Sequence, residues 1–216
     1  MHKNSFLFKQ DPHWKKKHPG IKQTTLPADV HSWVYERNSL TRRLRNYYGS
    51  SFAVKILFHR WKPAFLSECD LLQLPHQQFN LIREVLLHAN GKPLILARTI
   101  LPKQTIKVAK RNLSHLGTRP LGEVIFSYPK LERLELNTCC VQKHIWTNEL
   151  RETVNVEQQV WGRRTVYAIQ QQKMLVSEFF MPGALITSTT KLNNKKKQTS
   201  CNKLPSIITN FKSEKN

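Results

Sequence analysis

The chain has 216 residues, of which 39% are hydrophobic, 9% aromatic and 23% charged. This composition excludes collagen, coiled coils and mucin-like stalks, and the length suits one folded domain with a large buried core. Its apolar runs, such as residues 94–97, are far shorter than the roughly 20 residues of a membrane-spanning helix. The excess of positive charge is large, with 35 Lys and Arg against 14 Asp and Glu.

About half of this excess charge lies at the two ends of the chain. Residues 1–23 carry six Lys and one Asp, and residues 187–216 carry seven Lys and one Glu. Such ends are typical of disordered arms that improve solubility or are loosely attracted to any polyanion, with an acidic membrane surface as the alternative. We therefore predict a flexible basic arm at 1–25, a folded domain at 26–186 and a disordered tail at 187–216. No groove-reading motif or aromatic platform in the sequence supports specific binding of nucleic acid.

Two features bear on the compartment in which the protein works. The start, MHKNSFLFKQ, has a basic flank but an apolar stretch of only three residues, which is too short for the core of a signal peptide. The four cysteines show no CxxC spacing. We therefore expect free thiols in a reducing cytoplasm and no metal site.

The first part of the domain predicts a helical hairpin followed by a strand. One helix is expected at 27–37, and a second at 39–48 with Ser39 as its N-cap and Gly49 as its stop signal. Apolar side chains then alternate with smaller or polar ones over 52–58, as in a half-buried strand.

The clearest local signal lies in residues 79–101. Asn90 and Gly91 stand between two runs with β-strand patterning, and Asn-Gly in that position is the signature of a hairpin with a type I′ turn. We therefore predict two antiparallel neighbouring strands here.

The rest of the domain continues this pattern. A short helix is expected at 116–126, with Pro120 in its first turn, where the missing N–H costs nothing. Three further strands are expected at 131–142, 161–170 and 173–181. Neighbouring strands joined by tight turns, with no alternation of strand and helix, predict an α+β domain, a single antiparallel sheet with helices packed on it.

Three charged residues interrupt apolar faces of these strands. Arg83, Arg98 and Glu178 each share a face with aliphatic or aromatic side chains two residues away on either side. Burial of a charge is costly unless the charge is paired, so an internal salt bridge of Glu178 with Arg83 or Arg98, or partly wet faces, would explain any one of them. Three together favour an internal cavity for a small anionic ligand, because an arginine binds a carboxylate and a carboxylate accepts a hydroxyl proton.

The short helix at 116–126 adds a weaker signal of the same kind. If Pro120 opens it, the backbone N–H groups of Leu121 and Gly122 have no intrahelical acceptor and lie at the positive end of the helix dipole. An ordinary capped helix with water on these groups is the alternative.

Five segments of the sequence resemble the chorismate lyase family. In chain order they are SLTRRL (39–44), LIREVLLHANGKPLILARTILP (81–102), LGTRPLGEVIF (116–126), VWGRRTVYAI (160–169) and LVSEFFMPGALI (175–186). The last four are fairly specific as a set, and together with their spacing the five cover most of residues 30–186.

The resemblance implies a fold and a reaction. The fold is an antiparallel sheet whose ligand cavity is covered by helical flaps. The reaction is the elimination of pyruvate from chorismate to give 4-hydroxybenzoate, without a cofactor, as the first committed step of ubiquinone biosynthesis. The implied partners are this substrate and this product, and we expect a monomer.

The resemblance also implies roles for individual residues. The arginine that holds the ring carboxylate falls on Arg83, and the carboxylate at the 4-hydroxyl group falls on Glu178. Backbone contacts to the substrate carboxylate fall on Leu40 in a flap and on Leu121 at a helix start. Arg98 matches an arginine of the family's hairpin, and we expect it to support substrate binding electrostatically.

Some positions depart from the family or have no assigned role. Ala97 stands where a glycine is expected and crowds the expected cavity, and the connection at 137–159 is longer than usual. Arg163 and Arg164 suggest either a second anion site or strand packing with an outward arginine. A non-catalytic ligand-sensing domain of the same fold is the alternative function, although about 25 residues before the domain are too few for a winged helix-turn-helix.

Overall fold

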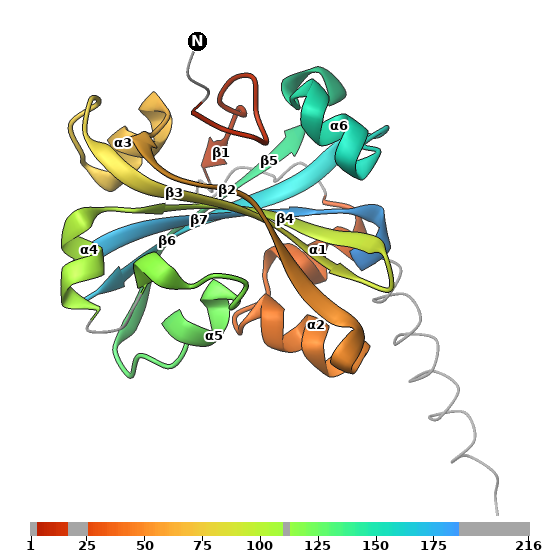
Figure 1. Cartoon of the computed structure of the whole chain (residues 1–216), viewed down its shortest axis with the longest axis horizontal. Helices are drawn as coiled ribbons and strands as arrows, with labels where there is room; N and C mark the ends of the chain where they lie inside the picture. The colour runs from red at the N-terminus through yellow and green to blue at the C-terminus, as the bar shows by residue number, and fades with distance from the viewer. Residues whose placement is uncertain (1–3, 17–25, 110–112, 186–216) are drawn as a thin grey trace, which may run out of the picture.

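A computed structural model describes residues 4–16, 26–109 and 113–185. Within these residues, seven strands form one antiparallel sheet in the order β1-β5-β6-β7-β4-β3-β2 (Figure 1). The strands are β1 (Lys15–Lys16), β2 (Phe52–Pro63), β3 (Phe79–Ala89), β4 (Lys92–Leu101), β5 (Leu131–Val141), β6 (Val160–Ile169) and β7 (Gln172–Phe180). The predicted α+β class with a single antiparallel sheet is confirmed.

Helices cover both faces of this sheet. They are α1 (Ala28–Val34), α2 (Leu40–Tyr48), α3 (Leu66–Leu72), α4 (Lys103–Val108), α5 (Leu121–Ile125) and α6 (Asn148–Val154). Figure 1 shows α1, α2 and α5 below the sheet and α3 and α6 above it. We call the side of α1, α2 and α5 the lower face and the side of α3 and α6 the upper face.

The hairpin of β3 and β4 forms as the sequence predicts. Ala89 pairs with Lys92, and Asn90 and Gly91 between them have φ angles of 50° and 72°. Two residues with positive φ are what a type I′ turn requires. Because β7 pairs with β4 and β2 pairs with β3, neither strand of this hairpin lies at an edge of the sheet. Most residues of both strands are buried.

The helical hairpin at the start of the domain also agrees with prediction. The Ser39 side chain caps α2 by accepting a hydrogen bond from the backbone N–H of Arg42, and α2 ends at Gly49, which has a φ of 57°. Trp33 and Leu44 belong to the hydrophobic core between this hairpin and the lower face. Burial of these residues fixes α1 and α2 on that face.

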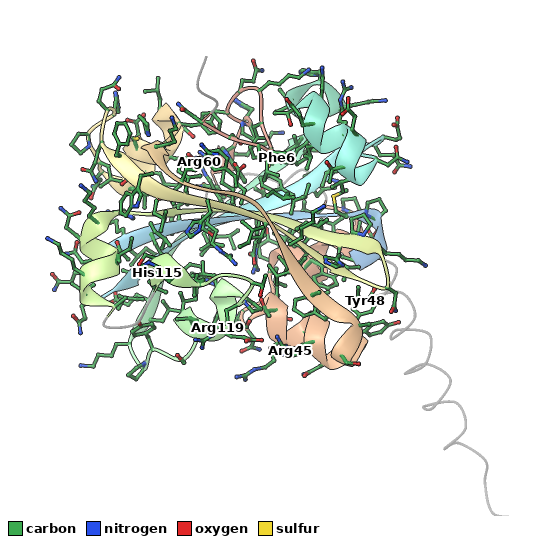
Figure 2. The ribbon with its side chains drawn as sticks, viewed as in Figure 1. Phe6, Arg45, Tyr48, Arg60, His115 and Arg119 are labelled. Atoms are coloured by element: carbon green, nitrogen blue, oxygen red, sulfur yellow. The ribbon has the colours of Figure 1, made fainter. Side chains whose placement is uncertain are left out.

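The N-terminal segment corrects the prediction of a flexible arm over 1–25. Residues 4–16 pack against the upper face, the side opposite Arg45 in Figure 2, where Phe6 is labelled. Phe8 is 4% exposed and stacks on Trp146, with 4.8 Å between ring centroids. Three apolar residues in a row are too few to show periodicity, which is why the sequence pattern missed this contact. Residues 1–3 and 17–25 of the predicted arm, and the whole predicted tail at 187–216, lie outside the described residues.

This packing predicts a large effect of a substitution in the N-terminal segment. Phe8→Ala should lower the free energy of unfolding by about 3–5 kcal/mol, because it leaves a cavity beside Trp146. Urea denaturation of the full chain measures it. The matched control is Phe79→Ala, since Phe79 is 53% exposed and its loss should change stability by less than about 0.5 kcal/mol. Equal, small effects of the two substitutions would contradict the ordered segment.

Several short helices were not predicted from the sequence. Helix α3 lies between β2 and β3, α4 follows β4 directly, and α6 lies in the polar connection between β5 and β6. Each has six or seven residues, which is too short for a clear helical period. Within the described part of the chain, no helix is long and apolar enough to cross a membrane.

Candidate active site

A partly open cavity lies between the lower face of the sheet and the helices α2 and α5. The space in it that is open to the centre of a water molecule is about 40 Å³, enough for a few water molecules. The sheet contributes the floor, and the first residues of α2 and α5 contribute the roof. The lining residues are Ser39, Leu40, Thr41, Val54, Arg83, Val85, Leu87, Ile95, Ala97, Thr99, Pro120, Leu121, Gly122, Ile125, Phe126, Tyr167, Val176 and Glu178.

Arg83 is a buried cation in this lining. Its side chain comes from β3, is 2% exposed, and donates from one terminal nitrogen to the backbone carbonyls of Gly117 and Arg119, at 2.9 and 3.0 Å. Its Nε is buried and has no hydrogen-bond partner within the described residues, and no carboxylate there forms an ion pair with it. Burial lowers the pKa of Arg83 to about 10. The group therefore keeps its charge at neutral pH without a neutralising partner.

Glu178 is the carboxylate of the same cavity. It comes from β7, and its Oε2 accepts a hydrogen bond from Nε of Arg163 on β6 at 2.7 Å. No hydrogen bond to its Oε1 is formed within the described residues. The predicted alternative, a pair of Glu178 with Arg83 or Arg98, is therefore not what forms.

The register places Arg83 and Glu178 on one face with a gap between them. Arg83 pairs with Thr99 of β4, and Glu178 pairs with Ala97 of the same strand, two residues away. Since β4 lies between β3 and β7, the two backbones are about 10 Å apart across the sheet. A long arginine and a glutamate that point into one cavity can thus reach opposite ends of a small ring.

The roof brings two further predicted residues to the cavity. Leu40 is the first residue of α2 and Leu121 is the first residue of α5, and both line the cavity. The backbone N–H groups at the start of a helix have no acceptor within it. Both predicted backbone contacts are therefore next to the space that a ligand would occupy.

Two contacts hold the two halves of the roof together. A Cβ atom built on Gly122 of α5 would lie 2.9 Å from Oγ of Ser39 and 3.1 Å from Oγ1 of Thr41, so the helices approach closely only because this residue is glycine. On the outside, Arg45 and Glu123 form a salt bridge of 2.9 Å between α2 and α5. Figure 2 shows Arg45 and Arg119 on this side of the molecule.

Arg98 lies on the other face of the sheet, which corrects the prediction that it supports substrate binding. Its guanidinium forms salt bridges with Glu68 at 2.7 Å and Glu84 at 2.6 Å. Burial by itself would lower the pKa of Arg98, but these two carboxylates outweigh burial and raise it above the usual value. Glu84 also accepts hydrogen bonds from the Ser5 hydroxyl and the Phe6 backbone. Arg98 thus belongs to the network that attaches the N-terminal segment to the upper face.

The arginine pair of WGRR divides between the two faces. Arg163 points to the lower face and binds Glu178, whereas Arg164 points to the upper face and donates to Oγ of Ser67 at 2.8 Å. Its guanidinium also lies over the Trp14 ring, 4.8 Å from the centroid. Neither prediction for this pair, a second anion site or an outward arginine, describes Arg163, which is 1% exposed.

Tyr167 is a cavity residue that the sequence did not single out. Its hydroxyl accepts a hydrogen bond from Arg133 at 3.0 Å. Burial, with a contribution from the charge of Glu178, raises the pKa of the Tyr167 hydroxyl. Alternation along β6 puts Tyr167 on the face of Arg163, so the period of two would have found it once that face was known. Ala97 also lines the cavity, as its expected position implies.

The described residues hold no group of three or more His, Cys, Asp or Glu side chains that could bind a metal ion. Cys69, Cys139 and Cys140 are free thiols, and Cys201 lies outside the described residues. What the cavity offers chemically is therefore one unneutralised guanidinium, one carboxylate, backbone N–H groups and a few hydroxyl groups, set among mainly apolar side chains.

Comparisons with known proteins identify the family of this chain. The profile of the family described as chorismate lyase matches residues 12–191. A protein named "Probable chorismate pyruvate-lyase" from Methylococcus capsulatus is 40% identical over 156 residues, which are 72% of this chain and 96% of that protein. A protein of the same name from Nitrosomonas europaea is 31% identical, over 73% of this chain and 89% of that protein.

Solved structures of lower similarity were also found. The C-terminal domain of the histidine utilization repressor from Pseudomonas syringae has a TM-score of 0.46 and 9% identity, over 62% of this chain and 93% of that chain. A GntR-family transcriptional regulator from Bacillus cereus has a TM-score of 0.47 and 14% identity, over 62% and 94%. The family match and the curated relatives decide the assignment: this chain belongs to the chorismate lyase family of enzymes.

Proposed function

We propose that this chain is a chorismate pyruvate-lyase that eliminates pyruvate from chorismate and leaves 4-hydroxybenzoate, the first committed step of ubiquinone biosynthesis. The observation that carries the proposal is the charge of Arg83. A buried guanidinium without an anionic partner is costly, and a carboxylate in the cavity would neutralise it. Chorismate has two carboxylates, one of them directly on its ring.

The substrate carboxylate is proposed to bind between the floor and the roof of the cavity. Arg83 supplies the charge and its free Nε–H, and the N–H groups of Leu40 and Leu121 supply hydrogen bonds from the two helices. A charged donor and two fixed backbone donors would hold the ring in one orientation.

Glu178 is proposed to act at the opposite end of the ring. Its free Oε1 accepts a hydrogen bond from the 4-hydroxyl group, which favours release of electrons at C4. The C4 proton leaves, the C3–O bond breaks, and the ring becomes aromatic; the departing enolpyruvate takes up a proton to give pyruvate. Aromatisation supplies the driving force, so we assign to the protein the roles of orientation and electrostatic stabilisation, without a cofactor and without proton abstraction by Glu178 itself.

A direct assay tests the proposed function. Purified full-length protein is mixed with chorismate in buffer alone and in buffer with a metal chelator, and 4-hydroxybenzoate is followed by chromatography. Equal turnover in both buffers is expected. Binding of 4-hydroxybenzoate without any turnover of chorismate would contradict the proposal and would indicate a ligand-sensing domain instead.

The close approach at Gly122 makes a prediction about the roof. Gly122→Ala should raise the Kd for 4-hydroxybenzoate about tenfold, because the new methyl group pushes α5 away from Ser39, whose side chain is held by its capping bond to α2. Isothermal titration calorimetry measures the Kd. Glu123→Ala is the control, since it removes only an exposed salt bridge worth less than about 1 kcal/mol. An unchanged Kd in Gly122→Ala would show that the two helices separate without affecting the ligand.

We propose a monomer in the cytoplasm, whose Lys-rich ends associate loosely with an acidic membrane surface. The positive charge of the sequence supports this association. Flotation with acidic liposomes, with and without residues 187–216, tests it; binding that does not depend on these residues would remove the role of the tail.

A further inference from the structure

Arg163 connects the carboxylate of the candidate site with the roof above it. Its Nε donates to Oε2 of Glu178 at 2.7 Å, and its NH1 faces backbone carbonyls of Trp33, Val34 and Glu36 at 3.2, 3.0 and 2.8 Å. The side chain is 1% exposed. One buried guanidinium thus binds a cavity carboxylate and the C-terminal end of α1 at the same time.

The carbonyls that Arg163 binds lie just before the roof. The chain passes from Glu36 to the N-cap Ser39 and then to Leu40 within four residues. Arg133 of β5 holds the same stretch, because it donates to the carbonyls of Glu36 and Arg37, both at 3.2 Å, and to the Tyr167 hydroxyl. The start of α2 is therefore attached to the sheet through arginines that also bind cavity side chains.

The bond to Glu178 has a direction that matters for the ligand. Arg163 occupies Oε2, so the second oxygen of the carboxylate is left to face the cavity. A carboxylate without this bond would be free to rotate and to place neither oxygen at the ring. The fixed planar fork of a guanidinium suits this task, since it donates in two directions without moving.

We propose that Arg163 is a positioning residue for the lyase reaction, which orients the Glu178 carboxylate and, through the end of α1, the Leu40 end of the roof. This inference rests on the proposed function. It assigns Arg163 no contact with the substrate. Arg163 acts through Glu178 and through the backbone that leads to Leu40.

Arg164 provides a matched control. It is the next residue, is 5% exposed and is hydrogen-bonded, but it lies on the upper face away from the cavity. The Met substitutions at 163 and 164 remove the same group from equally buried positions. A purely structural role for Arg163 predicts the same consequences for both, whereas positioning predicts a kinetic effect of Arg163→Met alone.

Single-turnover kinetics with chorismate separates a positioning role of Arg163 from a purely structural one. Arg163→Met should lower the single-turnover rate constant between about tenfold and a hundredfold, which is the cost of misplacing a reacting group by about 1 Å, and Arg164→Met should lower it less than threefold. Arg163→Lys, which keeps the charge but has no planar fork, should fall between Arg163→Met and the wild type. Equal rate constants for Arg163→Met and Arg164→Met would overturn the proposal.

A double-mutant cycle with Glu178→Gln shows whether Arg163 acts through Glu178. In the Glu178→Gln background, Arg163→Met should lower the single-turnover rate constant by a factor at least about threefold smaller than in the wild-type background, because the carboxylate that it orients is already absent and only its effect through the roof remains. An equal loss in the two backgrounds would overturn the assignment, since it would mean that Arg163 does not act through Glu178.

Hydrogen exchange tests the link to the roof without any turnover. Amides of residues 36–41 should exchange at least about tenfold faster in Arg163→Met than in the wild type. In Arg164→Met their exchange rates should be the same as in the wild type. Unchanged exchange in Arg163→Met would overturn the proposed link to Leu40. If the wild type does not convert chorismate, the proposed function is refuted, and so is the role of Arg163 in the reaction. The exchange result would still decide whether Arg163 holds the Leu40 end of the roof.

Discussion

Arg83→Met is expected to lower kcat/KM for chorismate by about a thousandfold or more. Arg83 is the cation of the cavity and has no carboxylate partner within the described residues. Loss of a charged, desolvated contact to a carboxylate costs several kcal/mol, and 1.4 kcal/mol is a factor of ten. Steady-state kinetics over a wide range of chorismate concentrations measures this, and most of the loss should be in KM.

The controls for Arg83 separate charge from geometry and from folding. Arg83→Lys keeps the charge without the planar fork, and its kcat/KM for chorismate should fall about ten- to a hundredfold. Arg164→Met, an equally buried arginine outside the cavity, should change kcat/KM less than threefold. A chorismate kcat/KM for Arg83→Met within tenfold of the wild type would mean that another group binds the carboxylate.

The lowered pKa of Arg83 gives an independent test. Benzoate is a suitable probe because it has the carboxylate but no phenol group that titrates. Arg83 is charged below its pKa, which is about 10 in the cavity, so the affinity for benzoate should be constant from pH 7 to 9. Above pH 10 the guanidinium loses its proton and the affinity should fall. An affinity that stays constant to pH 11 would contradict the lowered pKa of Arg83.

The alternation of side chains identified Arg83 and Glu178 because the period of two in a strand is fixed by backbone geometry. The same rule could not decide which face of β4 meets the cavity. Strand β4 is buried on both faces, so its sequence shows no polar side, and Arg98 and Thr99 have equal claims until the neighbouring strands are placed. In the structure Thr99 lines the cavity, whereas Arg98 lies on the upper face, where Glu68 and Glu84 neutralise its charge.

The sequence pattern gave no information on contacts between distant segments. The partner of Glu178 is Arg163 on β6. The guanidinium of Arg163 also binds carbonyls at the end of α1, about 130 residues earlier in the chain. The N-terminal segment likewise binds Glu84 across 78 residues. Such contacts depend on the tertiary arrangement and not on local propensity, so turns and strands were predictable while the positioning of the site was not.

Glu178→Gln is expected to lower the single-turnover rate constant by about a hundredfold, with the chorismate Kd changed less than threefold. The amide can accept a hydrogen bond from the 4-hydroxyl group but carries no charge to favour electron release at C4. Loss of one preorganised electrostatic contact in a desolvated site has an effect of this size. Rapid mixing of excess enzyme with chorismate measures the rate constant, and equilibrium binding of 4-hydroxybenzoate checks that the site is intact. Full turnover with normal binding would contradict the role of the carboxylate.

Glu178→Gln also removes the partner of a buried cation, so a loss of activity needs a control for stability. Breaking a buried ion pair by removing one partner costs about 3–5 kcal/mol, because the other charge stays buried without compensation. Adding Arg163→Met removes that charge, so the double variant should regain thermal stability relative to Glu178→Gln. If Glu178 acts on the substrate, the double variant should be more stable than Glu178→Gln but should have no higher single-turnover rate constant. Recovery of the rate constant together with stability would instead mean that Glu178 serves only to neutralise Arg163.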